Sequence, residues 1–382
     1  MSKARITIVG GGIGGFTAAI ALLARGFPVT LLEAAPAFGE VGAGVTLSPN
    51  AMLGYVYLGL AEKIAAAGVE PVRQRIQHWA DGRTLRVMER ADMRQRHGAP
   101  YVYIHRADLH AILVAAAAAG GGVLLTGAAA VAVEGSDVIL ADGRRIEGDL
   151  VVGADGLKSV VRQRFEEDKA HFTGHVVWRA LAPVEGPLVD LAHFPGMHIG
   201  PGRMVVRYPV RGSKVLNMVF FARQPGWEQD GWTIPAARSD LEQTFAGWAP
   251  EVQAMIAAAP EGQLYKWAIN ARKPLADWAL EDKVVLLGDA AHAMTPFMGQ
   301  GAACAIEDAI VLSRALSVAG SIGEGLRRYV AARHERATFI QGESNANADR
   351  LQAADTELFG LEELRNEDSL GLLDYDCRTV PV

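Results

Sequence analysis

The chain has 382 residues, half of them apolar, and this length exceeds the usual size of a protein with one hydrophobic core. Its formal net charge is −6 and it has no Lys/Arg-rich run, which argues against nucleic acid or an anionic membrane as a partner. The composition therefore predicts a globular protein of two domains, or of one core with a large insertion, whose partner is a small molecule.

Targeting and cysteine signals are weak. The first apolar run breaks at once into glycines, where a secretory signal would need a longer apolar core. No window offers the roughly 18 uninterrupted apolar residues of a membrane-spanning helix. The two cysteines, Cys304 and Cys377, are too few for a disulfide framework and too far apart for a CxxC redox or zinc motif. We therefore expect a cytoplasmic protein with reduced thiols, no metal and no membrane association.

The N-terminal residues alternate between strand and helix patterns. Residues 5–9 are β-branched and apolar after the first, residues 13–25 are rich in alanine and leucine, and residues 28–32 are apolar again. A glycine run separates the first strand from the helix. The pattern predicts one βαβ unit.

A hairpin follows, because residues 76–89 alternate around Asp81-Gly82, a dipeptide typical of tight hairpin turns. The elements predicted next are a strand at 101–104, a helix at 107–118, short strands across 123–149 with a turn at Asp142-Gly143, a strand at 150–153 and a helix ending near Arg164.

The hydrophobic pattern changes between residues 171 and 268. Alternating apolar segments dominate this region, and it contains five of the seven tryptophans. This predicts an inserted antiparallel sheet, with strands at 176–182, 204–208 and 215–221 and helices at 239–248 and 250–258. A buried strand at 284–287 and two long helices at 301–316 and 323–345 then return to the first pattern.

The glycine run carries a nucleotide fingerprint. Gly10, Gly12 and Gly15 satisfy G-x-G-x-x-G between a strand and a helix. In such turns the first glycine permits the tight turn, the second lets a pyrophosphate approach, and the third lets helix pack on strand. Glu33 ends the next strand, where a carboxylate accepts hydrogen bonds from ribose hydroxyls and repels a 2′-phosphate. The fingerprint does not distinguish NAD from FAD.

These patterns predict a mixed α/β fold, with a Rossmann-like domain built from both ends of the chain, an inserted antiparallel β-sheet substrate domain and C-terminal helices. We expect the nucleotide-binding domain to comprise residues 1–72, 100–170 and 270–355, and the substrate domain residues 73–99 and 171–269. Residues 356–382 form a tail. It has little periodicity from Asn366 onward, which predicts poor order.

A second ligand signal lies near the C-terminal end. The strand at 284–287 stops at Gly288-Asp289, and a helix begins near Gly301. An Asp at the end of a strand can accept hydrogen bonds from polyol hydroxyls, and glycines 299 and 301 allow a ligand to approach the helix start. Without a ligand, Asp289 would simply cap the helix.

Three further pieces accompany these signals: His105-Arg106-Ala107-Asp108-Leu109, Asp155-Gly156, and Gly299-Gln300-Gly301-Ala302 followed by Glu307-Asp308-Ala309. In this order and spacing, across nearly the whole chain, they resemble the single-component FAD-dependent aromatic hydroxylases, the family of 4-hydroxybenzoate, salicylate and 6-hydroxynicotinate monooxygenases. The resemblance implies an FAD-binding domain with bound FAD, and NADH or NADPH as a transient co-substrate. It further implies that O2 hydroxylates a small aromatic or N-heteroaromatic acid through a flavin C4a-hydroperoxide. The lack of a second G-x-G-x-x-G agrees with this family.

The resemblance also implies roles for single residues. Gly10, Gly12, Gly14 and Gly15 would bind the FAD pyrophosphate, Glu33 and Ala34 would bind the adenosine ribose, and Ala130 would flank the adenine. Arg106 would contact the polyol or phosphate, Asp289 would bind the ribityl chain, and Asp155 would take part in binding both FAD and nicotinamide. Val45 and Thr46 would belong to the loop against the flavin, and Gly301 and Ala302 would contact the isoalloxazine ring. Two alternatives stay open. Arg106 could form a surface ion pair with Asp108, and Asp155 could only cap the following helix.

The chain departs from its relatives where a catalytic base is expected. The 6-hydroxynicotinate enzymes carry histidines near the positions of Thr46 and Phe297, and salicylate-type enzymes carry one after the proline that corresponds to Pro296. The base and the substrate therefore stay open.

Candidates for the substrate pocket are Arg207, Tyr208 and Pro296. Arg207 and Tyr208 are neighbours on a predicted strand, so one of them should face inward. An inward Arg207 would suit a carboxylate as a bidentate partner, and an outward one would be solvated.

Two other functions remain possible readings of the same motifs. One is an epoxidase or tailoring monooxygenase of a larger neutral substrate, and the other is a non-catalytic flavin-binding redox sensor. The sequence leaves open the choice between NADH and NADPH and between a monomer and a homodimer.

Overall fold

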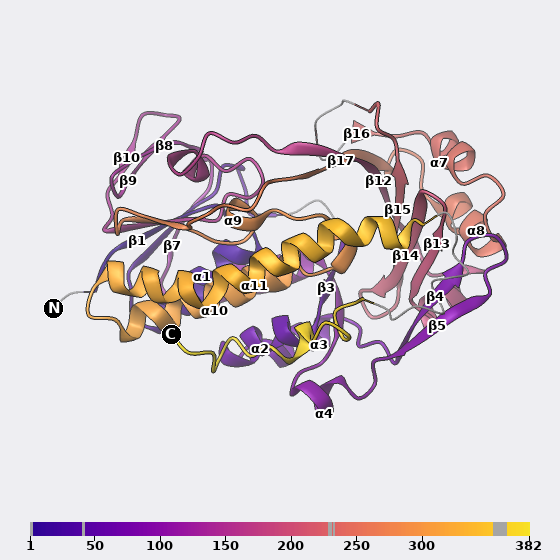
Figure 1. The fold of residues 1–382 in the computed structure, drawn as a ribbon, viewed down its shortest axis with the longest axis horizontal. Helices are drawn as coiled ribbons and strands as arrows, with labels where there is room; N and C mark the ends of the chain where they lie inside the picture. Colours follow the sequence, from indigo (N-terminus) through magenta and orange to yellow (C-terminus); the bar gives the residue numbers. More distant parts are fainter. Residues whose placement is uncertain (1–2, 40–42, 228–230, 232–233, 354–364) are drawn as a thin grey trace.

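The computed structural model describes residues 3–39, 43–227, 231, 234–353 and 365–382. Two regions lie side by side, one built around a six-stranded sheet and the other around an eight-stranded sheet, and a long helix runs between them (Figure 1). The predicted mixed α/β fold with an inserted sheet is confirmed. Among the described residues, no helix is both long and apolar enough to cross a membrane.

The six-stranded sheet is parallel except at one edge. Its order is β18 (Ala279–Leu280), β19 (Val284–Leu286), β11 (Leu150–Gly153), β1 (Ile6–Val9), β2 (Val29–Leu32) and β7 (Val123–Leu125), and only β18 is antiparallel to its neighbour. Every residue of β1 and β11 is buried, as parallel strands covered on both faces require. The sheet therefore unites strands from both ends of the chain.

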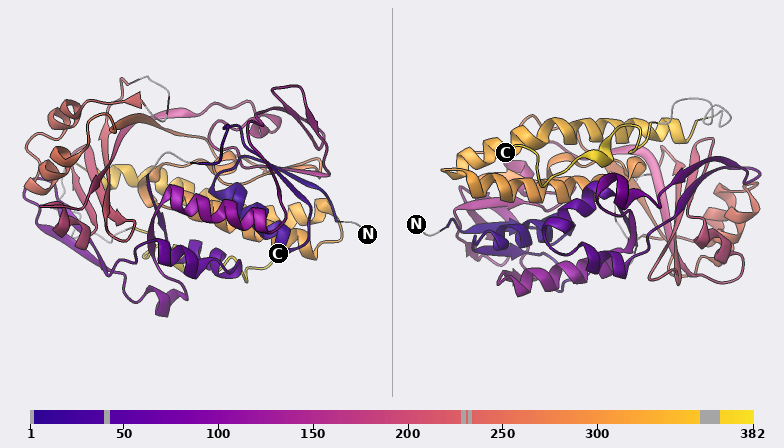
Figure 2. Two further views of the ribbon diagram at one scale, coloured as in Figure 1. Left: turned by 180° about the vertical axis from the view of Figure 1, so that it is seen from behind. Right: turned by 90° about the horizontal axis from the view of Figure 1, so that it is seen from below.

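Helices and two small sheets surround this sheet. Helix α1 (Ile13–Ala24) packs against α5 (Arg106–Ala119) and α10 (Gly301–Val318), and α10 packs against α11 (Ile322–Leu351) (Figure 2). The remaining elements of this region are β3 (Gly44–Leu47), α2 (Pro49–Tyr57), α3 (Ala61–Ala67), α4 (Met93–His97), β6 (Val102–His105), β8 (Ala130–Glu134), β9 (Asp137–Leu140), β10 (Arg145–Ile146), η1 (Val161–Arg164), α9 (Asp289–His292), η2 (Pro296–Met298) and η4 (Leu372–Asp374).

The eight-stranded sheet contains the predicted insertion and the predicted hairpin. Its order is β16 (Ile234–Pro235), β17 (Tyr265–Ala271), β12 (His171–Pro183), β15 (Val215–Arg223), β14 (Arg203–Val210), β13 (Gly196–Gly200), β4 (Arg73–His78) and β5 (Thr84–Glu89). Only the β13–β4 pair is parallel. The expected Asp81-Gly82 turn is confirmed, since β4 and β5 pair antiparallel and Gly82 has a positive φ of 69°.

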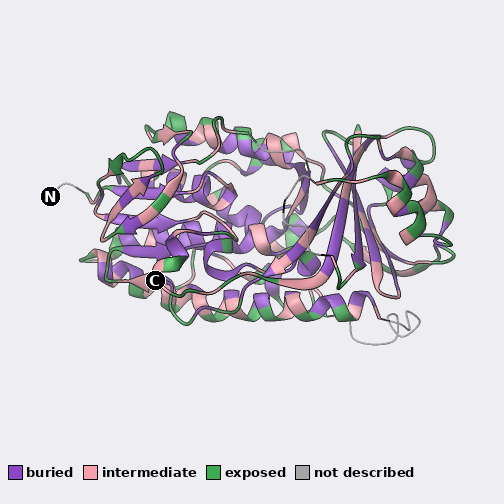
Figure 3. Ribbon diagram, turned by 90° about the horizontal axis from the view of Figure 1, so that it is seen from above, coloured by how far each residue is buried: buried purple, intermediate pink, exposed green. Residues whose placement is uncertain are grey.

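The two faces of this sheet pack against different partners. Val205 and Phe220 lie in a core with α6 (Leu188–His193), α7 (Arg238–Thr244) and α8 (Pro250–Ala258). Their sequence neighbours Met204 and Phe221 lie on the other face, with Phe297 and the end of α11. The strands of this sheet are largely buried (Figure 3). Strand alternation therefore directs one face to the outer helices and the other to the six-stranded region.

Three predicted helices differ in extent. The helix expected after Asp155 is only the 3-10 turn η1, and α7 ends at Thr244, close before Gly247 with its positive φ of 76°. Helix α11 continues to Leu351 rather than residue 345, because Ala348 and Leu351 pack against the eight-stranded sheet. Tertiary packing thus extends α11, whereas a local glycine follows the end of α7.

The prediction of a poorly ordered tail is wrong for residues 365–382, whereas residues 354–364 lie outside the described part. Leu372, Leu373 and Cys377 are buried, and the carbonyl of Cys377 accepts a hydrogen bond of 2.9 Å from Arg314. These anchors follow neither a helical nor a strand period, so periodicity misses them. Both cysteines are free and buried, as expected.

Candidate active site

The glycine turn between β1 and α1 combines tight packing with one open position. A Cβ at Gly10 would lie 2.4 Å from the carbonyl oxygen of Ala154, and one at Gly15 would lie 2.0 Å from that of Gly10. A Cβ at Gly12 would meet nothing within 4 Å. The first and third glycines therefore close the turn, and the second leaves the helix N-terminus open to a ligand.

Glu33 lies at the carboxyl end of β2, beside this turn. Its Oε2 accepts a hydrogen bond of 2.9 Å from the N–H of Gly11, and its Oε1 accepts one of 2.7 Å from the N–H of Ala35. A cavity of about 940 Å³ opens here, and its lining includes Gly10, Gly12, Glu33, Ala34, Ala130 and Asp155. The tertiary structure thus brings together residues from four separate segments.

Asp155 both borders this cavity and caps a helical turn. Its carboxylate accepts hydrogen bonds from Ser159 Oγ at 2.6 Å and from the N–H groups of Val160 and Val161 at 2.7 and 3.2 Å. Burial raises the pKa of Asp155, although these hydrogen bonds oppose the shift. The capping alternative therefore describes its protein contacts, and its place in the lining leaves a ligand contact open.

Asp289 begins α9 and faces the cavity opposite Arg106, the first residue of α5. Burial raises the pKa of Asp289, and the nearby His292 and Arg106 oppose that shift. Burial lowers the pKa of Arg106, and Asp289 opposes it. Asp108 pairs with Arg211 at 3.1 Å, and Asp289 is the carboxylate that acts on the pKa of Arg106.

The N-terminus of α10 forms another open edge. A Cβ at Gly299 or Gly301 would meet nothing within 4 Å, and Ala302 follows in the first turn of this 18-residue helix. Helix N-termini present free N–H groups and a partial positive charge. Gly14 on α1 is different, because a Cβ there would lie 2.9 Å from Leu287, so it serves close packing.

A second cavity, of about 510 Å³, lies between the two regions. Its apolar wall comes from the inner face of the eight-stranded sheet and from η2, and includes Val177, Met204, Phe221, Trp267, Pro296 and Phe297. Val45 and Thr46 of β3 line it as well, together with Gly301 and Ala302. It shares residues with the glycine-turn cavity, among them Gly12, Arg106, Arg179, Trp267 and Asp289, so the two spaces are adjacent.

The pocket candidates Arg207 and Tyr208 lie on opposite faces of β14. Tyr208 faces the cavity and stacks on Tyr103, with ring centroids 4.5 Å apart. Arg207 is buried, and its guanidinium reaches His198 Nδ1 at 3.3 Å and the carbonyl of Phe194 at 3.1 Å, on the face of Val205 and the outer helices. Arg207 is therefore not solvated, and although it is among the residues that border the cavity, its guanidinium is bound on the opposite face of β14.

Arg179 is a site residue that sequence reasoning did not single out. It lies on β12, borders both cavities and packs its guanidinium over Trp267 at 4.9 Å. Its buried Nε has no hydrogen-bond partner among the described residues, and burial lowers its pKa to about 10. A single cation within the apolar run at 176–182 was the available signal.

The residues around the first cavity fit a dinucleotide, and those around the second fit a flat ring beside it. A pyrophosphate requires open backbone such as that at Gly12, and a ribose requires an acceptor such as the carboxylate of Glu33. An anionic ring edge requires an open helix N-terminus such as the start of α10. FAD satisfies all three requirements at once.

Comparison with known proteins identifies the family. Residues 3–343 match the FAD binding domain family. The chain is 39% identical to 3-hydroxybenzoate 6-hydroxylase of Polaromonas naphthalenivorans, covering 82% of this chain and 79% of that protein. It is 38% identical to aurachin C monooxygenase/isomerase of Stigmatella aurantiaca, covering 88% and 87%.

A solved structure agrees with these matches. HpxO of Klebsiella pneumoniae, complexed with FAD and uric acid, superposes with a TM-score of 0.84 at 25% identity and covers 98% of this chain and 95% of that one. The resemblance inferred from the sequence is confirmed. The chain belongs to the FAD binding domain family and is a FAD-dependent monooxygenase of the aromatic hydroxylase type.

Proposed function

We propose that this chain uses NADH or NADPH and O2 to hydroxylate a small aromatic or N-heteroaromatic acid. The observation that carries the proposal is that the two cavities are adjacent and share lining residues, among them Gly12, Arg106, Arg179, Trp267 and Asp289. A ring bound in the apolar cavity would lie against the edge of a flavin held at the glycine turn and at α10. FAD, once reduced by the nicotinamide coenzyme, supplies the oxygen activation.

Except for Gly15, which closes the glycine turn, the residues that we propose as cofactor contacts line one or both cavities. Gly10, Gly12, Gly14 and Gly15 form the turn for the pyrophosphate, Glu33 and Ala34 bind the ribose, Ala130 flanks the adenine, Arg106 and Asp289 bind the phosphate and polyol, Val45 and Thr46 lie against the ring, Gly301 and Ala302 donate N–H groups to it, and Asp155 borders the nicotinamide side.

The protein's own contribution is to bind the substrate, exclude water and keep protons in place. The wall of Val177, Met204, Phe221 and Trp267 is apolar and excludes water from the reacting ring. Burial raises the pKa of Tyr103 and of Tyr208, so both phenols stay protonated at neutral pH. Of the described residues that line this cavity, none is a histidine, which separates this site from those of the 6-hydroxynicotinate enzymes.

A second candidate is oxidation of a larger neutral substrate, which the aurachin C relative favours. The volume of the cavity favours the small aromatic acid as substrate. Its roughly 510 Å³ is bordered by Gly12, Gly301 and Ala302, so we expect the flavin ring to occupy part of it and to leave room for about one further ring.

The test measures substrate-stimulated oxidation of NADH and of NADPH, with oxygen uptake and product analysis, on the FAD-loaded protein. The panel comprises hydroxybenzoates, anthranilate, hydroxynicotinates, picolinates and, as the larger neutral class, alkylquinolones. Stimulation by one acid, with hydroxylated product equal to the coenzyme consumed, supports the proposal. Stimulation only by an alkylquinolone would replace it with the second candidate.

A further inference from the structure

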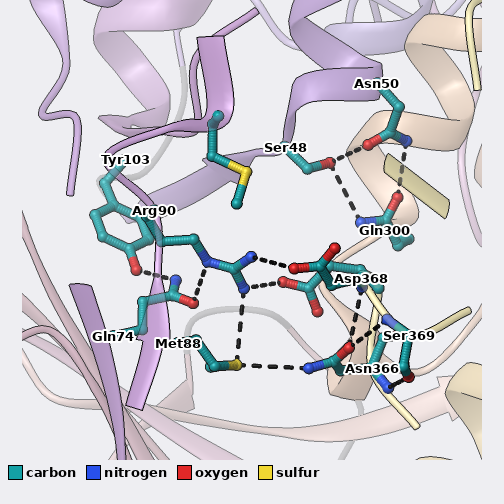
Figure 4. A network of polar contacts seen from close by, with 12 residues as sticks. Ser48, Asn50, Gln74, Met88, Arg90, Tyr103, Gln300, Asn366, Asp368 and Ser369 are labelled. Atoms are coloured by element: carbon teal, nitrogen blue, oxygen red, sulfur yellow. Dashed lines mark hydrogen bonds and ion pairs between the residues drawn. The ribbon is translucent and has the colours of Figure 1, made fainter. Parts of the chain in front are cut away.

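The C-terminal segment forms one end of the substrate cavity. Asn366 and Glu367 line it together with Gln74 of β4, Met88 of β5 and Tyr103 of β6, and none of these five borders the glycine-turn cavity (Figure 4). This end is therefore the one distant from the pyrophosphate site. Asn366 Nδ2 contacts the Met88 sulfur at 3.6 Å, which seats the segment on the hairpin.

Arg90 joins this segment to the cavity wall. Its side chain is fully buried, and its Nη2 donates to Glu367 Oε1 at 2.5 Å, with Asp368 4.0 Å away. Its guanidinium also lies over the ring of Tyr101 at 4.6 Å. Burial alone would lower the pKa of Arg90, but the carboxylates of Glu367 and Asp368, together with Tyr101 and Tyr103, outweigh burial and the pKa is raised. The buried charge thus depends on a residue 277 positions away in the chain.

The donors and acceptors then form a chain with only one possible direction. A guanidinium can only donate, and Arg90 Nε donates to Gln74 Oε1 at 2.9 Å. The amide oxygen of Gln74 is therefore committed, and its Nε2 donates to the hydroxyl oxygen of Tyr103. Because that bond uses the oxygen as an acceptor, the hydroxyl hydrogen of Tyr103 must point elsewhere, and Tyr103 lines the cavity.

We infer that Glu367 is a positioning residue which, through Arg90 and Gln74, orients the Tyr103 hydroxyl as a hydrogen-bond donor to the carboxylate of an aromatic substrate. The inference rests on the proposed function for its substrate class. A carboxylate is an acceptor only, so it matches a hydroxyl whose hydrogen is directed into the cavity. The charges of Arg90 and Glu367 offset each other, so the pair itself neither attracts nor repels the anion strongly. A substrate carboxylate bound at this end, distant from the pyrophosphate site, would leave the substrate's aromatic ring beside the flavin.

The experiment measures equilibrium binding of benzoate and of 3-hydroxybenzoate to the FAD-loaded protein by calorimetry and by flavin fluorescence. Glu367→Gln keeps the shape of the side chain and removes its charge, and we expect benzoate to bind about tenfold more weakly, the loss of one hydrogen bond to a charged group. Tyr103→Phe should weaken binding by a similar factor. Asp376→Asn, which breaks an ion pair with Arg378 elsewhere in the same segment, is the control and should leave binding unchanged.

Two further variants separate positioning from a structural role. In the Tyr103→Phe background, Glu367→Gln should have no additional effect on benzoate binding, because its action passes through the missing hydroxyl. Gln74→Glu should weaken binding although Arg90 gains a further carboxylate, because the new carboxylate accepts the Tyr103 hydrogen and turns it away from the cavity.

The outcomes keep this inference apart from the proposed function. An undiminished effect of Glu367→Gln in the Tyr103→Phe background, tighter binding by Gln74→Glu, or no benzoate binding to the unaltered protein overturns the inference. Benzoate binding that responds as expected, without hydroxylation of any aromatic acid, supports the inference and rejects the proposed function.

Discussion

The carboxylate of Asp308 accepts a hydrogen bond of 3.0 Å from the backbone N–H of Gly288, the residue that precedes Asp289. The same carboxylate contacts His292 Nε2 at 2.6 Å and Arg333 Nε at 2.8 Å. Gly288 has a positive φ of 59°, so this turn needs both a glycine and an external acceptor. Asp308 on α10 therefore holds the turn that presents Asp289 to the cavity.

Replacing Asp308 with asparagine should loosen this turn. Arg333 would lose one of its two buried carboxylate partners, and we expect the free energy of unfolding to fall by about 2–3 kcal/mol. We also expect FAD to bind about tenfold more weakly, because Asp289 is no longer held in place. Urea unfolding and recovery of flavin fluorescence measure the two effects. Unchanged FAD affinity with lower stability would mean that Asp308 acts on the core alone.

The free energy of unfolding should depend on pH in the acid range through the carboxylate of Asp308. Burial raises the pKa of Asp308, but His292 and Arg333 outweigh burial and lower the pKa to about 2, below the usual value of 3.8. A lowered pKa stabilises the fold above about pH 4, and this contribution, about 2 kcal/mol, is lost as the pH falls toward 2. The difference in urea midpoint between the unaltered protein and Asp308→Asn should therefore shrink between pH 6 and pH 3. A constant difference would assign the effect to packing.

Alanine substitutions at two glycines of the fingerprint should affect different properties, FAD affinity in one case and stability in the other. Gly12→Ala places its Cβ in open space, so the apoprotein should unfold within about 0.5 kcal/mol of the unaltered chain while FAD affinity falls at least tenfold. Gly15→Ala places its Cβ 2.0 Å from a backbone oxygen, so stability itself should fall by several kcal/mol. Calorimetry of the apoproteins and FAD titration distinguish these effects. Equal loss of stability in both variants would contradict the assignment of Gly12 to ligand approach.

Arg179 and Arg207 should differ in the sign of their effect on stability. Burial lowers the pKa of both to about 10, and the Nε of each has no partner among the described residues, but the Nη atoms of Arg207 reach the Phe194 carbonyl and His198. Arg179→Met should therefore raise the Tm of the apoprotein and slow substrate-stimulated coenzyme oxidation. Arg207→Met should lower the Tm, because the Phe194 carbonyl loses its donor.

Two results would contradict the prediction for Arg179. A lower Tm in the Arg179→Met apoprotein would show that the cation is stabilised by contacts within the fold. An unchanged rate of coenzyme oxidation would remove Arg179 from the site, whatever its effect on stability.

Local patterns in the sequence were enough to determine the parts of this protein that depend on neighbouring residues. The βαβ unit, the Asp81-Gly82 hairpin and α5 follow from hydrophobic period and from glycines at turns, and each forms within a few residues of the expected bounds. The glycine fingerprint and Glu33 likewise indicated a dinucleotide site because their spacing reflects one compact supersecondary unit.

Only the tertiary structure decided the features that depend on distant contacts. Strand alternation predicted that Arg207 and Tyr208 face opposite ways, but not which of them faces the cavity, because that depends on which side the helices α6 to α8 cover. The C-terminal segment carries no period, and its order comes from buried anchors such as Cys377 and from the pairing of Glu367 with Arg90 across 277 positions. Such contacts leave no local trace, since each partner alone resembles an ordinary charged or apolar surface residue.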